Sequence, residues 1–81
     1  MTHELKIWNP PFEEILAGKK RYEIRKADRP FTVGDEVWLR EWVKGYTGRE
    51  LFVVITHVTK AGSWGLPDDL CVFGFRLRRG R

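Results

Sequence analysis

A short segment in the first third of the chain carries ionisable side chains at a fixed spacing. Within residues 18–25, which read GKKRYEIR, five of the eight side chains are charged, Lys20, Glu23 and Arg25 among them. An ammonium and a guanidinium attract phosphate, and the guanidinium offers a planar fork of donors. A carboxylate can accept a hydrogen bond from the amino group of a base, as it does toward cytosine. These three groups could together hold an anionic or amino-bearing ligand.

The same segment is expected to form a β-strand, which decides where these groups point. Residues 21–26 alternate Tyr22 and Ile24 with charged neighbours, a period typical of a strand. Because successive side chains of a strand face opposite ways, we expect the apolar pair to point into the core, with Glu23 and Arg25 pointing outward. From periodicity alone, a cross-strand ion pair on a solvated surface, worth under about 1 kcal/mol, would explain the charges equally well.

A short helix is expected after the first strand. Asn9 can cap it, prolines are tolerated in its first turn, and Gly18 can end it, which leaves about two turns. We expect Phe12, Ile15 and Leu16 to share its buried face.

The remaining chain predicts β-structure. The expected strands cover residues 3–8, 21–26, 36–43, 49–59 and 70–77, with turns at 33–35 and 45–48 and a loop at 61–69. One short helix and five strands in so few residues indicate a mainly β (α+β) fold. We expect a small β-barrel, since closing the sheet removes its exposed edges.

Length and composition indicate one domain over residues 1–81 of a cytoplasmic protein. A chain of 81 residues has no room for a second domain, and its one cysteine, Cys71, excludes an internal disulfide and favours a reducing compartment. We expect Cys71 to be a packed, unreactive thiol. The start of the chain lacks a signal-peptide pattern, and no apolar run reaches the roughly 18 residues of a membrane helix. Two His and one Cys show no zinc spacing, and no glycine cluster resembles a phosphate-binding loop, so we expect no metal or cofactor.

The positive charge is concentrated in two places. The net charge is +4, and the arginines of a basic C-terminal tail, residues 76–81, supply all of it. That tail could be a phosphate-seeking arm or a solvated end. The second concentration has six basic residues against two acidic ones and lies between Lys19 and Arg29, inside the folded part.

Several aromatic residues could provide stacking surfaces for exposed bases. Trp64 lies in the 61–69 loop, where it could stack on a base or fold back over the end of the barrel. Trp38, Arg40 and Trp42 share one face of a predicted strand. That face could bind a ligand or receive the helix.

The charged motif also has a relative among known families. Gly18, Lys20, Glu23 and Arg25 spell G-x-K-x-x-E-x-R, with a short helix before it and strands after it. This resembles the signature of the ASCH domain family, small relatives of the PUA-like fold. The stretches HELKIW, PPFEEILAG, YEIRK and VGDEVWLREW resemble one small branch of that family, found in bacteria and their phages.

The resemblance implies a PUA-like β-barrel with a cleft that binds RNA or modified nucleotides. Lys20, Glu23 and Arg25 would line this cleft, and Gly18 would allow a tight exit from the helix. Some members of the family remove the acetyl group from N4-acetylcytidine. There the resemblance sets a threonine nucleophile at the position of Glu23, and a carboxylate cannot act as that hydroxyl. A second acidic residue is also expected late in the chain, where Asp68 and Asp69 are the only candidates.

We therefore expect a module that binds RNA or a nucleotide in a charged cleft. The residues expected at the site are Lys20, Glu23 and Arg25, with Lys6, Arg40 and Trp64 as neighbours.

A second hypothesis is a metal-independent hydrolase of RNA or of a modified nucleoside, with Lys20 and Glu23 as catalytic groups. Glu23 would draw a proton from a 2′-hydroxyl, and His3 or His57 would be the general acid. A third hypothesis is a protein-interaction domain, because a basic cleft serves that role equally well.

Overall fold

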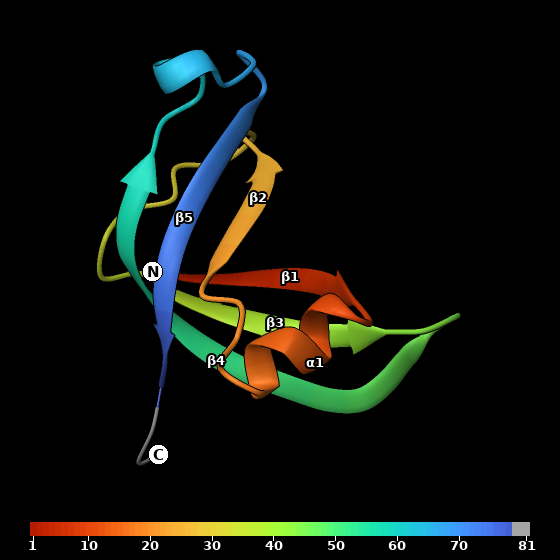
Figure 1. The fold of residues 1–81 in the computed structure, drawn as a ribbon. Helices are drawn as coiled ribbons and strands as arrows, with labels where there is room; N and C mark the ends of the chain where they lie inside the picture. Colours follow the sequence, from red (N-terminus) through yellow and green to blue (C-terminus); the bar gives the residue numbers. More distant parts are fainter. Residues whose placement is uncertain (79–81) are drawn as a thin grey trace.

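The computed structural model describes residues 1–78 and shows a mainly β chain with one short helix (Figure 1). Its elements are β1 (Thr2–Trp8), α1 (Pro11–Leu16), β2 (Tyr22–Lys26), β3 (Glu36–Trp42), β4 (Tyr46–Thr59), a 3-10 turn η1 (Ser63–Gly65) and β5 (Leu70–Leu77). The predicted helix and all five strands are confirmed, and β5 has the predicted bounds. The β3–β4 turn lies at residues 43–45 rather than 45–48, so β4 begins earlier than expected. Within residues 1–78, no helix has the length and apolarity needed to cross a membrane.

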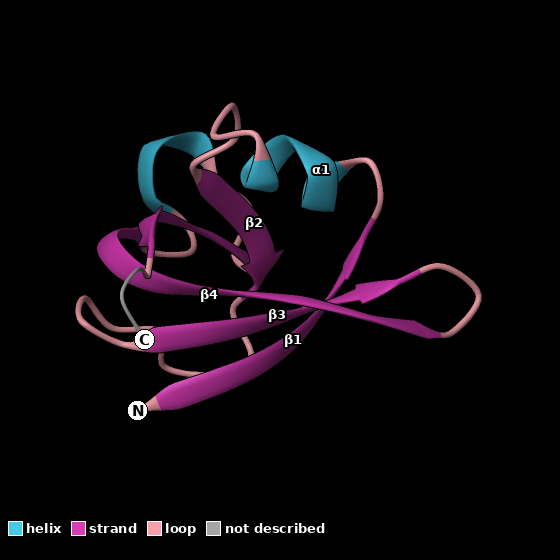
Figure 2. Cartoon of the chain, turned by 90° about the horizontal axis from the view of Figure 1, so that it is seen from below, coloured by secondary structure: helices cyan, strands magenta, loops and turns pink. Residues whose placement is uncertain are grey.

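The five strands form one sheet that curls into a half-barrel (Figure 2). Their order is β1-β3-β4-β5-β2, with β1 parallel to β3 and every other neighbouring pair antiparallel. The long strand β4 pairs with β3 through its first part and with β5 through its last part, and it bends where the register shifts between Ile55 and His57. The curled sheet agrees in part with the expected barrel, but it is not closed, because β1 and β2 remain its two edges.

The hydrophobic core fills the concave side of this half-barrel. Val37, Leu39 and Val53 are fully buried there. Helix α1 covers them with Phe12 and Ile15, which are 2% and 1% exposed. Leu16, expected on the same face, is instead exposed, since a six-residue helix buries only a narrow stripe.

Buried Glu41 on β3 ties the start of α1 to the β3–β4 hairpin. The Asn9 amide donates to its Oε2 at 2.9 Å, and the Thr47 hydroxyl donates to its Oε1 at 2.8 Å. The Arg49 guanidinium donates to Glu41 at 3.0 Å and also binds Glu13 on α1. The prediction that Asn9 caps α1 is therefore wrong: the first helical turn has no side-chain cap, and the Asn9 amide binds Glu41 instead.

A second buried polar pair anchors the start of β1. His3 Nε2 lies 2.8 Å from Asp35 Oδ2, and the same carboxylate accepts the Thr32 N–H at 3.1 Å. His3 is only 4% exposed and packs against Phe31. The pair closes the turn before β3 and holds His3 inside the fold.

The described part of the predicted basic tail, residues 76–78, is tied to the fold. Arg76 and Leu77 are part of β5, and the Arg78 N–H donates to the Phe52 carbonyl at 2.9 Å. The Arg78 guanidinium also pairs with Glu36. Residues 79–81, the rest of the predicted tail, lie outside the described residues.

These carboxylates predict how stability depends on pH. The hydrogen bond from Asn9, then that from Thr47, lowers the pKa of Glu41, and the bond with His3 lowers the pKa of Asp35. A carboxyl whose pKa is lower in the folded state stabilises above its unfolded pKa and loses that effect as the pH falls. We expect the free energy of unfolding, measured with urea, to fall steadily below about pH 4.

Glu41→Gln should lower stability at pH 7 and make the acid decline shallower, because the lowered pKa of the Glu41 carboxyl then no longer contributes. An acid decline equally steep in this variant would show that the Glu41 network is not coupled to folding.

Candidate functional site

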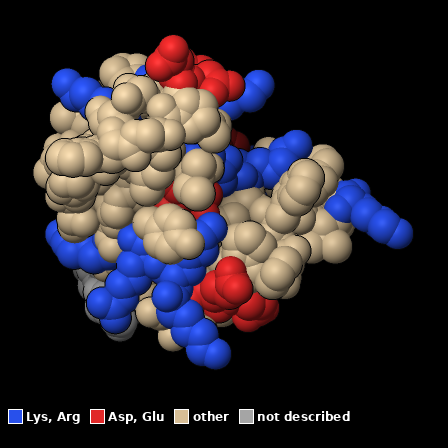
Figure 3. Space-filling view, turned by 45° about the horizontal axis from the view of Figure 1, so that its top comes forward, with Lys and Arg blue, Asp and Glu red and all other residues tan. Residues whose placement is uncertain are grey.

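A hollow of about 580 Å³ lies at the open seam of the half-barrel, between the edge strands β1 and β2. Basic side chains lie around a hollow near the middle of the face in Figure 3, with acidic atoms visible inside it. We call this hollow the cleft. Its lining includes Lys6, Lys20, Glu23 and Arg25, four of the six residues predicted at the site.

Strand β2 presents its polar face inward, which is the reverse of the expected orientation. Tyr22 and Ile24 are 48% and 53% exposed, whereas Glu23 is 4% exposed. In the β2–β5 register Glu23 lies opposite Phe73, a fully buried residue, so both point to the concave side. The expectation was wrong because β2 is an edge strand. Its residues on the concave side of the sheet face the cleft rather than the packed core.

The three motif side chains meet on the cleft floor. Lys20 Nζ lies 2.8 Å from Glu23 Oε1, and Arg25 Nε lies 2.9 Å from Glu23 Oε2. One carboxylate is thus held between an ammonium and a guanidinium. Gly18, at φ +78°, ends α1 as predicted and turns the chain so that Lys20 reaches Glu23.

Arg25 also bridges the seam. Its NH2 group donates to the Lys6 carbonyl of β1 at 2.8 Å, and Arg29 reaches the Glu4 carbonyl at 3.5 Å. These carbonyls belong to the free edge of β1, where pairing with a further strand would otherwise satisfy them. Arginine side chains therefore cover the β1 edge, and the space between the strands stays open.

Two predicted neighbours do not join the site in the way expected. Lys6 lines the cleft, but its ammonium is directed to an aromatic ring rather than to Glu23: Nζ lies 3.9 Å from the centre of the Trp42 ring. Arg40 pairs with Glu4 at 2.8 Å, stacks on Tyr46 and does not line the cleft. The face of β3 that carries Arg40 does not receive the helix, since α1 packs on the opposite, concave side.

Trp64, predicted as a stacking aromatic beside the cleft, lies apart from it. Trp64 is 95% exposed in η1 and neither covers the end of the barrel nor lines the cleft. Trp8, at the end of β1, does line the cleft and is 66% exposed. Trp8 falls within the strand predicted at residues 3–8, but only the position of β1 at the seam brings it to the cleft.

Sequence reasoning assigned no role to Lys26, Asp28 and Arg29, which also line the cleft. The signal was present as the basic cluster between Lys19 and Arg29. What it could not show was that the chain after β2 turns back along the same hollow.

The cleft combines polar groups with an apolar wall that includes Leu5, Ile7 and Phe31. The Glu23 carboxylate has acceptor positions beyond the two occupied by Lys20 and Arg25, and both cations have further N–H donors. The site can therefore donate and accept hydrogen bonds beside a surface that suits a flat, apolar ring.

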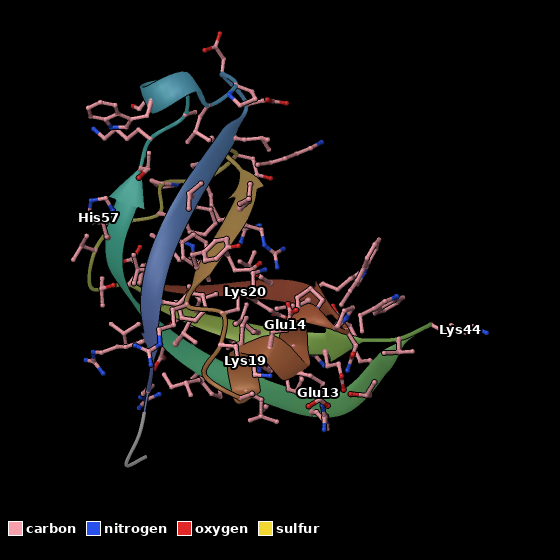
Figure 4. All side chains as sticks on the ribbon, in the orientation of Figure 1. Glu13, Glu14, Lys19, Lys20, Lys44 and His57 are labelled. Atoms are coloured by element: carbon pink, nitrogen blue, oxygen red, sulfur yellow. The ribbon has the colours of Figure 1, made fainter. Side chains whose placement is uncertain are left out.

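Other candidate reactive groups lie outside the cleft. Neither His3 nor His57 lines it; His57 lies on β4, on the far side of β5 from β2 (Figure 4). Cys71 is packed in the core as predicted, and burial raises the pKa of its thiol.

The fold and the site together thus define the class of this protein: it is a half-barrel with a charged cleft at its open seam. The chain belongs to the DUF3850 family, described as a domain of unknown function, whose profile matches residues 2–75. It is also similar to an "Uncharacterized 12.9 kDa protein in GpA 3'region" of Escherichia phage P2. Over 63 aligned residues the two are 46% identical; the alignment covers 76% of this chain and 58% of that relative.

The orientation of β2 predicts unequal costs for two isoleucine substitutions. Ile24→Ala should lower the free energy of unfolding by less than about 1 kcal/mol, because Ile24 is half exposed. Ile55→Ala should cost about 2–5 kcal/mol, because Ile55 is 1% exposed. Urea denaturation of both variants checks this. Equal, large losses would mean that Ile24 points into the core after all.

Proposed function

We propose that this chain is a binding module for RNA or for a nucleotide, held in the cleft. The observation that carries the proposal is the convergence of Lys20, Glu23 and Arg25 at 2.8 and 2.9 Å on the floor of a 580 Å³ hollow. That volume lies within the range of roughly 300–1,000 Å³ typical of small-ligand sites. The motif's resemblance to the ASCH family, together with the curled β-sheet, supports a PUA-like fold and this class of ligand.

The chemistry of the cleft suits a single unpaired nucleotide. A base would lie along the apolar wall, within reach of the exposed Trp8 ring at the rim. Its polar edge would meet Glu23 as acceptor, with Arg25 and Lys20 as donors. Arg29, further along the lining, would meet the phosphate.

Catalysis has less support than binding. Both Glu23 oxygens already accept hydrogen bonds from cations, and within residues 1–78 no histidine lines the cleft to be the general acid. Asp68 and Asp69, the late acidic candidates, do not line it either, and Asp28 is its only other acidic lining residue among those described. We therefore place a binding role before a hydrolytic one.

Charge removal on the cleft floor should weaken RNA binding. Lys20→Ala and Arg25→Ala should each reduce affinity for a single-stranded RNA about 10-fold or more, because charge-assisted hydrogen bonds contribute roughly 1.5–3 kcal/mol. Fluorescence anisotropy at several salt concentrations measures this, with thermal unfolding as the check on folding. Lys44→Ala is the matched control, since Lys44 lies at the tip of the β3–β4 hairpin (Figure 4). Unchanged affinity in both cleft variants would eliminate this site.

Glu23 should set the preference among bases. Glu23→Gln keeps the shape of the side chain but adds an N–H donor, so the preference for an amino-bearing base should weaken. Calorimetric titration with cytidine and uridine 5′-monophosphates should show the ratio of the two affinities moving toward one in the variant. A ratio that does not change would mean that Glu23 only positions the two cations.

A further inference from the structure

A second hollow, of about 420 Å³, lies between the end of α1 and the last residues of β5. We call it the basic hollow. Its cationic lining residues are Lys20, Arg21 and Arg76, and no acidic residue among those described lines it. Lys20 lines the cleft as well, so one side chain lies in the wall between the two hollows.

The arginines of the basic hollow differ from the other arginines of residues 1–78. Arg25, Arg29, Arg40, Arg49 and Arg78 each form an ion pair with a carboxylate. Arg21 and Arg76, the two remaining arginines in that part of the chain, form none. The Arg21 Nε donates only to the Gly18 carbonyl, at 3.3 Å. Both guanidiniums thus keep donors that can bind an anion.

The fold holds these like charges together. The Phe75 N–H donates to the Arg21 carbonyl at 3.0 Å, which extends the antiparallel pairing of β2 and β5 past the start of β2. Arg76 is the next residue of β5, so Arg21 and Arg76 lie on adjoining strands at the same end of the β2–β5 pair. Two like charges held near each other repel, at a cost in free energy. A bound anion would remove that cost.

We propose that the basic hollow binds a backbone phosphate of a single-stranded nucleic acid whose neighbouring nucleotide occupies the cleft. This inference rests on the proposed function and narrows its ligand from a free nucleotide to a polynucleotide. Guanidiniums bind phosphate through paired N–H donors, and Lys20 would link the two subsites. The rest of the lining includes the apolar residues Ile15, Phe75 and Leu77, so the cations are the main groups with which the hollow can recognise a phosphate.

The test separates the two hollows by the length of the ligand. The probes are homopolymeric hexaribonucleotides of the four bases and the corresponding 5′-mononucleotides. The variant is Arg21→Gln/Arg76→Gln, which removes two charges that do not line the cleft. The matched control is Lys44→Gln/Lys60→Gln, which removes two exposed charges that line neither hollow.

We expect the arginine variant to bind the best hexamer about 10-fold more weakly and to bind the mononucleotides as the wild type does. The slope of log affinity against log salt for the hexamer should become shallower by about 0.7–1.4, the effect of losing one or two phosphate contacts on a single strand. The lysine control should keep the wild-type affinity and slope. Arg21→Lys/Arg76→Lys keeps both charges and should therefore keep most of the slope. That result would show that the weaker binding of the glutamine variant comes from lost charge and not from unfolding.

Three results would overturn the inference. An unchanged hexamer affinity in the arginine variant would reject the basic hollow, while mononucleotide binding would still support the cleft. Equal losses in the arginine and lysine variants would mean general attraction rather than a site. Displacement of the hexamer by an equal concentration of hexaglutamate peptide would point to an acidic protein segment as the occupant. Failure of the wild type to bind any hexamer or mononucleotide would instead refute the proposed function itself.

Discussion

A carboxylate on the concave side of a β-sheet is the constraint on which this structure depends. Glu23 is 4% exposed and lies opposite a fully buried phenylalanine, where an unpaired charge would cost several kcal/mol. Lys20 and Arg25 offset that cost by binding one oxygen each. The exit of α1 at Gly18 and the course of β2 deliver these two cations to the same carboxylate. A buried anion thus gathers the charged groups that a ligand would meet.

The open seam follows from the same arrangement. A barrel of this size normally removes its edges by pairing its first and last strands. Here the Lys6 carbonyl on the β1 edge accepts from the Arg25 side chain rather than from a β2 backbone N–H. A guanidinium on its alkyl stem spans more distance than a backbone hydrogen bond does, so the edge is covered without closing the gap. The space that remains between β1 and β2 is the cleft.

Much of the fold could be predicted from the sequence, but the orientation of β2 could not. Alternation located the strands, Gly18 marked the end of the helix, and the motif spacing brought three side chains to one site. In β2, however, polar and apolar residues alternate equally, and period-two patterning cannot say which face is inward. That depends on the neighbours of the strand, and an edge beside a cleft reverses the usual rule. The basic hollow was equally out of reach, because only the β2–β5 pairing brings Arg21 beside the end of β5.

Ion pairing distinguishes cations that support the fold from cations that remain available to a ligand. On the cleft floor Lys20 and Arg25 are already paired with Glu23, so that site can select a ligand by hydrogen bonding more than attract it by charge. Arg21 and Arg76 have no such partner among residues 1–78 and project a stronger field. Selectivity and attraction would then belong to adjoining hollows that share Lys20. Such a division favours a ligand long enough to occupy both, because a free nucleotide in the cleft would leave the unpaired arginines unused.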